Sequence, residues 1–246
     1  MRNVILLTFL CLCFAWETEA QSGGKVVFRL AHTLQGEPLE LQSKTYENAA
    51  GNKFILDRFK YYLSNIKLRN TRSGTFYLEP ESYHLVGVEN GKHIYEISIN
   101  GVNPGAYNEV EFAIGVDNAK NTSTDKVGAL DPANQMVWNW DTGYKFISVT
   151  GKLLSDNEAA PEGLVIHVGF DENYRIVRKT LSQLNLPNLV VTEGKTTVVE
   201  ISVEVDHLFN EPNAIDFTQN PVIMAGEPAR QLADNYQHMF TVKSIQ

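Results

Sequence analysis

The sequence predicts an all-β protein, a single β-sandwich-like domain with one short helix near its C-terminus. Roughly nine to twelve short apolar runs, many alternating with polar residues, recur at regular spacing between turns rich in Gly, Asn, Asp and Pro. Helical character is almost confined to residues 227–238. Residues 21–246 contain no repeat or low-complexity linker, and this length is ample for one core. We therefore assign residues 21–246 to one domain.

Residues 1–20 are predicted to be a secretory signal peptide. Arg2 precedes an apolar run over residues 4–16, which is short for a bilayer-spanning anchor, the alternative interpretation. Cys11 and Cys13 both lie in this run and each follows a leucine, which argues against lipidation. The mature chain then holds no cysteine, which excludes disulfides, thiolate metal sites and cysteine nucleophiles. We expect a secreted or periplasmic, non-lipidated protein.

The first half of the chain supplies the longest predicted strand. Residues 25–32 alternate as a strand does, and a turn at 36–38 ends the run. Residues 53–69 are rich in β-branched and aromatic side chains, and Asp57 with Arg58 predicts two strands or one bent strand there. Further strands are expected at residues 83–88, 93–99 and 107–114. Asn90 and Gly91 predict a tight hairpin between the first two of these.

The second half of the chain is also dominated by strand patterns. The expected strands cover residues 144–154, 164–170, 174–181, 196–205 and 239–245. A turn at 171–173 predicts a hairpin between the two strands that flank it. The expected helical segments are a single turn at 206–210 and a helix over 227–238, where Pro228 suits the first turn.

The charge and the motifs exclude several classes of function. A formal net charge of −8 argues against nucleic acid or an anionic membrane surface as the partner. No apolar run after the predicted signal peptide approaches transmembrane length. The sequence holds no GxSxG, HExxH or phosphate-binding glycine motif, and its aspartates lack EF-hand spacing. We expect a binding protein and not an enzyme.

Two histidines stand out among the 6 in the chain. His167 is the one polar side chain in an apolar run, and His32 ends the first predicted strand. Each has two interpretations, a buried histidine bonded to the backbone or a metal ligand, and placement alone favours the former for His167. No two histidines have a short ligand spacing, so a histidine site would need residues from distant strands.

Residues 115–151 are the least typical stretch of this β-rich chain. Met136, Trp138 and Trp140 recur at period two and would share one face of a strand. Such a face is first of all a core face, because large aromatic side chains dominate core burial. The alternative is an aromatic wall beside a metal or ligand. In the same stretch, Asn121 begins an N-glycosylation sequon.

Three groups of residues carry recognisable motifs. They are the early strand at 59–68, the element of His167, Val168 and Gly169, and a longer pattern made by Gly115, Val116 and Asp117, by Asn121, by Leu130, Asp131 and Pro132, by Met136, Trp138 and Trp140, and by Gly143, Tyr144, Lys145 and Phe146. Together they resemble motifs of the MbnP-like copper-binding domain family over about residues 26–240. The early strand resembles the family's early strand, the histidine element its HLG or HIG element, and the longer pattern its signature, roughly GV…N…PLN…MxWxW…GYKF.

The resemblance implies a secreted or periplasmic β-rich protein that binds copper through histidines with a tryptophan nearby. In methanobactin-associated members, a partner dihaem enzyme of the MauG type oxidises a tryptophan to kynurenine. An outer-membrane transport partner is also implied. On this resemblance, His167 is the first expected copper ligand and His32 the second. Trp138, Trp140 and Met136 would form the adjacent wall, and the role would be copper handling or acquisition.

The chain departs from the family pattern at one expected ligand. Members often place a histidine directly after the asparagine of the GV loop, but Asn118 and Asn121 are followed here by Ala119 and Thr122. Copper is normally held by two or three donors. Either His32 or Met136 completes the site, or the chain keeps the fold without the metal. The alternative function is therefore a metal-free binding or adhesion module.

Overall fold

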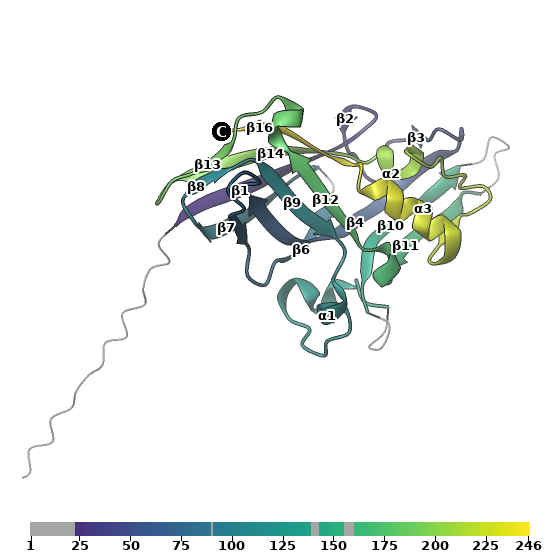
Figure 1. The fold of residues 1–246 in the computed structure, drawn as a ribbon. Helices are drawn as coiled ribbons and strands as arrows, with labels where there is room; N and C mark the ends of the chain where they lie inside the picture. The colour runs from purple at the N-terminus through teal and green to yellow at the C-terminus, as the bar shows by residue number, and fades with distance from the viewer. Residues whose placement is uncertain (1–22, 90, 139–142, 155–159) are drawn as a thin grey trace, which may run out of the picture.

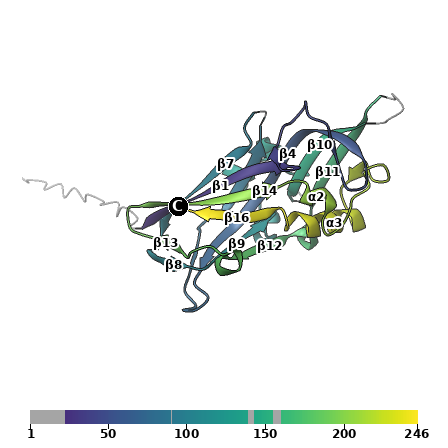
Figure 2. The same cartoon turned by 90° about the horizontal axis from the view of Figure 1, so that it is seen from above.

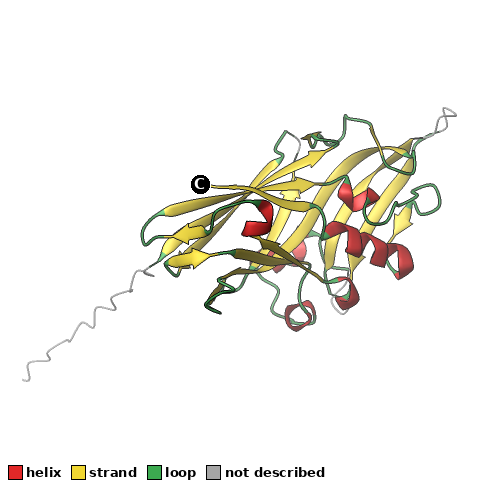
Figure 3. Cartoon of the chain, turned by 45° about the horizontal axis from the view of Figure 1, so that its top comes forward, coloured by secondary structure: helices red, strands yellow, loops and turns green. Residues whose placement is uncertain are grey.

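The computed structural model describes residues 23–89, 91–138, 143–154 and 160–246. The predicted signal peptide at 1–20 and Trp140 lie outside these ranges. In the described parts of the chain, strands form a 5-stranded sheet, a 9-stranded sheet and a 2-stranded ribbon (Figure 3). The predicted all-β fold is confirmed. None of the helices in these ranges has the length and apolar character that a membrane crossing needs.

The 5-stranded sheet is built around the N-terminal strand β1 (Gly24–Leu34). β1 pairs in parallel with β14 (Thr196–Glu204) and antiparallel with β7 (Ile94–Val102). β16 (Phe240–Ile245) joins the far side of β14, and Figure 2 shows β16, β14, β1 and β7 side by side. The turn expected at 36–38 includes the short strand β2 (Glu37–Pro38), which folds back on the end of β1.

The 9-stranded sheet is built around β4 (Lys53–Arg69), which pairs with β10 (Lys145–Leu154) and β9 (Glu109–Ile114). Beyond β10 lie β11 (Glu162–Gly169) and then β15 (Val222–Ile223). The other members of this sheet are β3 (Tyr46–Glu47), β5 (Phe76–Leu78), β6 (Tyr83–Val88) and β12 (Arg175–Thr180). The ribbon joins β8 (Gly105–Tyr107) to β13 (Leu189–Val191).

The main core lies between the two larger sheets. Phe28 and Phe240 come from the 5-stranded sheet, and Tyr61 and Phe112 come from the 9-stranded sheet. The ring of Phe112 lies edge-on to both phenylalanines, with centroids 6.5 Å from Phe28 and 5.1 Å from Phe240. Tyr61 lies 5.8 Å from Phe240. Alternation along each strand therefore buries one face of each sheet against the other.

β4 is one bent strand, which is one of the two forms that the sequence predicts. Leu56 pairs with Gly151 and Arg58 pairs with Thr150, so Asp57 has no partner on β10. This extra residue is a β-bulge, which bends the strand and increases its twist.

Two predicted hairpins are wrong because the strands that flank each turn belong elsewhere. Glu89 and Lys92 form a bridge around the predicted tight turn, but β6 pairs with β4 and β7 with β1, in different sheets. β11 and β12 also do not pair with each other, because β11 pairs with β10 and β15 whereas β12 pairs with β9. Between them Phe170 turns the chain at φ 68°, and a 3₁₀-helix follows at Asp171–Asn173.

Short helices close the ends of the sheets. The predicted C-terminal helix is confirmed as α3 (Gly226–Tyr236), and the predicted single turn as α2 (His207–Asn210). Figure 1 shows α2 and α3 beside the end of the sheet that holds β10 and β11. α1 (Asn118–Asn121) lies apart from them. The other 3₁₀-helices span Gly128–Leu130, Pro132–Asn134 and Leu181–Leu184.

Candidate functional site

Residues 115–138 lie over the outer face of the 9-stranded sheet. The Tyr62 hydroxyl donates to Ala129 O at 2.9 Å, and the Tyr144 hydroxyl donates to Leu130 O at 2.7 Å. These bonds hold the loop over a second hydrophobic cluster, separate from the main core. Its buried members are Tyr62, Val116, Leu130, Met136, Tyr144 and Phe146. Met136 is therefore a core residue here, 1% exposed, as the core interpretation expects.

Asn121 bonds to Tyr144, in the last part of the signature, and to Asp171, which follows β11. Its Oδ1 accepts the backbone N–H of Tyr144 at 2.8 Å, and its Nδ2 donates to Asp171 Oδ1 at 2.9 Å. Gly143 has φ +79°, and a Cβ there would lie 2.3 Å from Asn121 Oδ1, so glycine is required for two reasons. Asn121 is buried with both amide atoms engaged, which removes the sequon from the accessible surface.

Trp138 does not lie on a strand as its period-two spacing predicts. Val137 makes one isolated bridge with Tyr144, and no strand is assigned around Trp138 in the described residues. The half-buried indole stacks on Phe170 with centroids 5.8 Å apart at 18°, and lies edge-on to His167 at 5.8 Å and 77°. Lys145 Nζ lies 5.6 Å from its ring centroid. Trp140, the other tryptophan of the predicted wall, lies outside the described residues.

The indole N–H of Trp138 is buried, and none of the described residues accepts its hydrogen bond. A Cβ on Gly169 would lie 2.7 Å from Trp138 Nε1 and 2.3 Å from Tyr144 O. The glycine of the His167-Val168-Gly169 element therefore makes room for the tryptophan. An unsatisfied buried donor costs about 1–3 kcal/mol, so this N–H is an open position for a polar group.

His167 lies on the outer face of the 9-stranded sheet. Its register partner on β10 is Ser148, which in turn pairs with Lys60 on β4. No residue of the described chain bonds to its ring nitrogens. Burial first, then the charges of Lys145 and Arg58, lower the pKa of His167 from 6.5 to about 4. The imidazole is therefore neutral at physiological pH, with a nitrogen lone pair available for a metal.

His32, on β1, lies in the main core and contacts Tyr61 on the inner face of the 9-stranded sheet. Val168 and Tyr61 both pair with Ile147 and face inward, so the neighbouring His167 faces outward. His32 is 0% exposed, and its Nδ1 donates to His93 O at 2.8 Å. Its Nε2 is then left to accept from the Tyr61 hydroxyl at 3.1 Å. Both nitrogens are occupied, and the structure does not bring His32 to His167.

The described residues contain no group of three or more His, Cys, Asp and Glu side chains that could hold a metal ion. His84 Nε2 lies 2.8 Å from Glu79 Oε2, and His207 Nε2 lies 3.7 Å from Glu204 Oε2. Each is a pair and not a cluster. A metal at His167 would therefore need donors of other kinds.

Sequence reasoning missed the contacts that Phe170, Lys145 and Arg58 make at this site. Lys145 belongs to the signature and Phe170 follows the His167-Val168-Gly169 element, but no periodicity indicates that they contact the tryptophan. Arg58 comes to the site through the pairing of β4 with β10, which depends on register and not on local sequence.

The fold and this site define an all-β protein with an outward-facing imidazole held edge-on to a tryptophan beside its larger sheet. The profile of the MbnP family matches residues 23–225, and the chain belongs to this family. A search of curated proteins finds no match. Among solved structures, MbnP from Methylosinus trichosporium is similar, with a TM-score of 0.53 and 13% identity over 89% of this chain and 98% of that chain. At this identity the likeness shows the fold alone.

Proposed function

We propose that this protein binds copper outside the cytoplasm, in the periplasm or after secretion, and acts in copper handling or acquisition and not as an enzyme. The observation that supports this most is the arrangement of His167 and Trp138. A neutral imidazole without a hydrogen-bond partner in the described chain faces a tryptophan edge-on, in a protein of the MbnP family. Imidazole is a good copper ligand, and an aromatic face attracts a cation.

The residues present fit such an ion in part. His167 supplies one nitrogen donor, and the open N–H of Trp138 marks a position for a second polar group such as an anion or water beside the metal. Trp138, stacked on Phe170, lies edge-on to the imidazole. His32 is bonded within the core, and Met136 is buried in the second cluster, so neither completes the site as the structure stands.

Trp138, which lies within the described residues, is a candidate for the oxidation that family resemblance implies. A dihaem enzyme of the MauG type is the partner that family resemblance implies, and an outer-membrane transport protein is the other. Peptide mapping by mass spectrometry of protein from its native host tests this role. Conversion to kynurenine on the peptide of Trp138 supports it, whereas an unmodified Trp138 with a modified Trp140 would move the role to the second tryptophan.

Isothermal titration of the mature protein with copper tests the proposed function directly. We expect one copper ion per chain and a loss of affinity of at least about tenfold in His167→Ala, because a ligand is removed. His238→Ala is the matched control, since His238 is exposed and far from the signature in sequence. Unchanged affinity in His167→Ala would contradict the ligand assignment.

A metal-free binding or adhesion module is the second candidate function. The observations that favour it are the lack of a three-residue acidic or histidine cluster in the described chain and the two cations, Lys145 and Arg58, near His167. Metal analysis of protein purified from its native compartment distinguishes the two. A copper content of zero, unchanged after reconstitution, would support the metal-free module.

A further inference from the structure

Four basic residues lie in successive rows on the outer face of the 9-stranded sheet. The rows run across β4, β10 and β11, and strand pairing fixes them. Arg58 lies beside Thr150, and Lys60 lies beside Ser148. The other two members belong to β10 itself, in the rows before and after these. We call this set the basic stripe, and its members in row order are Lys152, Arg58, Lys60 and Lys145.

The basic stripe faces away from the main core. Phe59 and Val149 pair with each other between the two middle rows, and both belong to that core. Because side chains alternate across a strand, the rows on either side of this pair face outward. Arg58 and Lys152 are exposed, and the other two members are half-buried. The stripe is therefore open to a partner that approaches this face of the sheet.

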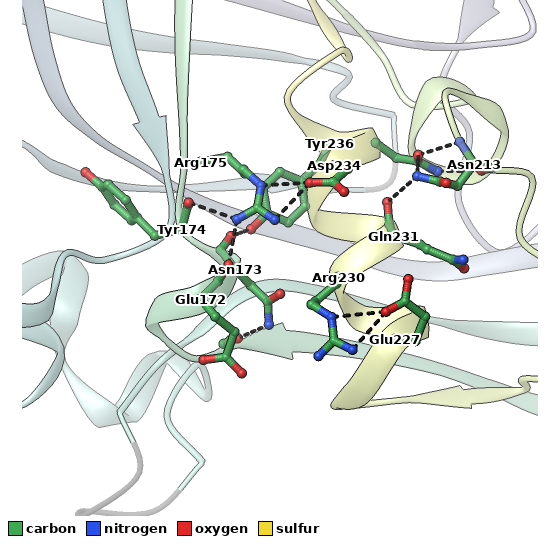
Figure 4. Close-up of polar contacts among 12 residues, drawn as sticks. Glu172, Asn173, Tyr174, Arg175, Asn213, Glu227, Arg230, Gln231, Asp234 and Tyr236 are labelled. Atoms are coloured by element: carbon green, nitrogen blue, oxygen red, sulfur yellow. Dashed lines mark hydrogen bonds and ion pairs between the residues drawn. The ribbon is translucent and has the colours of Figure 1, made fainter.

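No carboxylate of the described residues forms an ion pair with the basic stripe, whereas most arginines elsewhere are paired. Figure 4 shows two such pairs. Arg175 donates to Asp234 Oδ1 at 3.0 and 2.8 Å. Arg230 donates to Glu227 Oε2 at 3.1 and 2.8 Å. The acidic residue nearest to the stripe in sequence, Asp57, lies in the bulge of β4. The stripe thus keeps its positive charge for an outside partner.

The length and spacing of the basic stripe indicate which anion fits it. A strand rises about 3.3 Å per residue, so the span from Lys145 to Lys152 is about 23 Å. A single carboxylate or phosphate group contacts only part of that length. Successive rows lie about 7 Å apart, which is also the spacing of alternate side chains along an extended peptide. An extended segment with acidic residues at alternate positions therefore matches the stripe row by row.

The negative charge of the whole chain does not prevent such binding. The formal net charge is −8. At physiological ionic strength, exposed charges farther apart than about 8 Å are largely screened from each other. An acidic segment that lies on the stripe is therefore influenced mainly by the cations beside it.

We propose that the basic stripe binds an extended acidic segment of a partner protein, which lies along the outer face of β4 and β10. Each row takes one carboxylate, and the planar guanidinium of Arg58 can hold its carboxylate through two hydrogen bonds. The inference goes beyond the proposed copper binding, because it does not depend on a metal at His167.

Fluorescence anisotropy of a labelled polyglutamate peptide tests the inference on the mature protein. A peptide of about eight residues has an extended length of about 27 Å, which matches the stripe. The stripe variant combines Arg58→Gln, Lys60→Gln and Lys152→Gln. Lys145 is retained, because it also contacts Trp138. Titrations at about 0.01 M and about 0.15 M salt change the screening length from about 30 Å to about 8 Å.

A charge-matched variant is the control for the loss of net charge. It combines Arg72→Gln, Lys92→Gln and Lys195→Gln, at three exposed cations outside the stripe. Circular dichroism reports whether both variants are folded. The single variants Arg58→Gln and Lys152→Gln keep the test decisive if the triple stripe variant does not fold, because each should still weaken binding at least about twofold.

We expect the wild type to bind the peptide at low salt and to bind it more weakly as salt is added. The affinity should fall about tenfold in the stripe variant and less than about twofold in the control. Equal affinities of the two triple variants, unchanged affinity in both single variants, or a wild type that does not bind the peptide overturns the inference. Stripe-dependent binding of phosphatidylglycerol vesicles without peptide binding would assign the face to a membrane, which overturns it as well.

Discussion

Acid should destabilise this protein through His32. Burial in the core lowers the pKa of His32 from 6.5 to about 4, and this effect outweighs the hydrogen bond to His93 O, which by itself raises the pKa. In the unfolded chain the same ring takes a proton near pH 6.5. The folded form binds that proton less readily, so the stabilisation is fully present above pH 6.5 and is lost as the pH falls toward 4.

The magnitude follows from linkage between protonation and folding. Each unit of pKa difference corresponds to about 1.4 kcal/mol, so the whole contribution is about 3 kcal/mol and the part lost between pH 7 and pH 5 is about 2 kcal/mol. Urea denaturation at pH 7, 6 and 5 measures this loss. His32→Gln is the comparison, because glutamine keeps a donor and an acceptor but does not titrate in this range.

The difference between the two proteins isolates His32 from every other titrating group. We expect His32→Gln to be less stable than the wild type at pH 7 and to lose about 2 kcal/mol less on acidification to pH 5. Parallel stability curves for the two proteins over this range would refute the reasoning, because they would show that His32 does not remain neutral in the fold.

Three further predictions concern the signature segment and α3. Gly169→Ala should lower the free energy of unfolding by about 1–3 kcal/mol and shift the tryptophan fluorescence, because its Cβ would meet Trp138 Nε1 and Tyr144 O. Gly163→Ala is the control on the same strand, and it should do neither because the space around Gly163 is open. Asn121→Ala should lower the free energy of unfolding in urea by about 1–3 kcal/mol, because it leaves the buried N–H of Tyr144 unpaired. Expression of the wild type in a glycosylating host should leave Asn121 unmodified, and a glycan there would contradict its burial. Asp234→Asn should cost less than about 1 kcal/mol, because the ion pair with Arg175 is partly exposed, but it should speed hydrogen exchange in α3. Exchange equal to that of Glu227→Gln, which removes a more exposed pair, would contradict a role of Asp234 in holding α3.

The strands of this fold could be predicted from the sequence because alternation is a local signal. The run that became β14 and the bend in β4 at Asp57 both follow from side chains next to one another in the chain. The partners of these strands could not be predicted in the same way. Asn90 and Gly91 favour a tight turn, but nothing near them indicates that β6 and β7 join different sheets.

The same limit applies to the candidate site. His167 could be selected from its polar side chain in an apolar strand, but the face on which it lies depends on the register with β10. That register sets His32 and His167 on opposite sides of the sheet. The period-two spacing predicts that Trp138 lies on a strand. In the structure the chain makes one bridge at Val137, and the indole of Trp138 stacks on Phe170.

The parallel pairing of β1 with β14 has a consequence for the order in which the molecule can form. Arg29 on β1 bonds to Glu200 on β14 across 171 positions of sequence. The sheet around β1 therefore cannot be completed until β14, one of the last strands, has been synthesised. Contacts between residues so far apart in sequence make folding slow. A ribosome-bound chain that ends before β14 cannot close its main core. Closure of that core is therefore delayed until β14 has been synthesised.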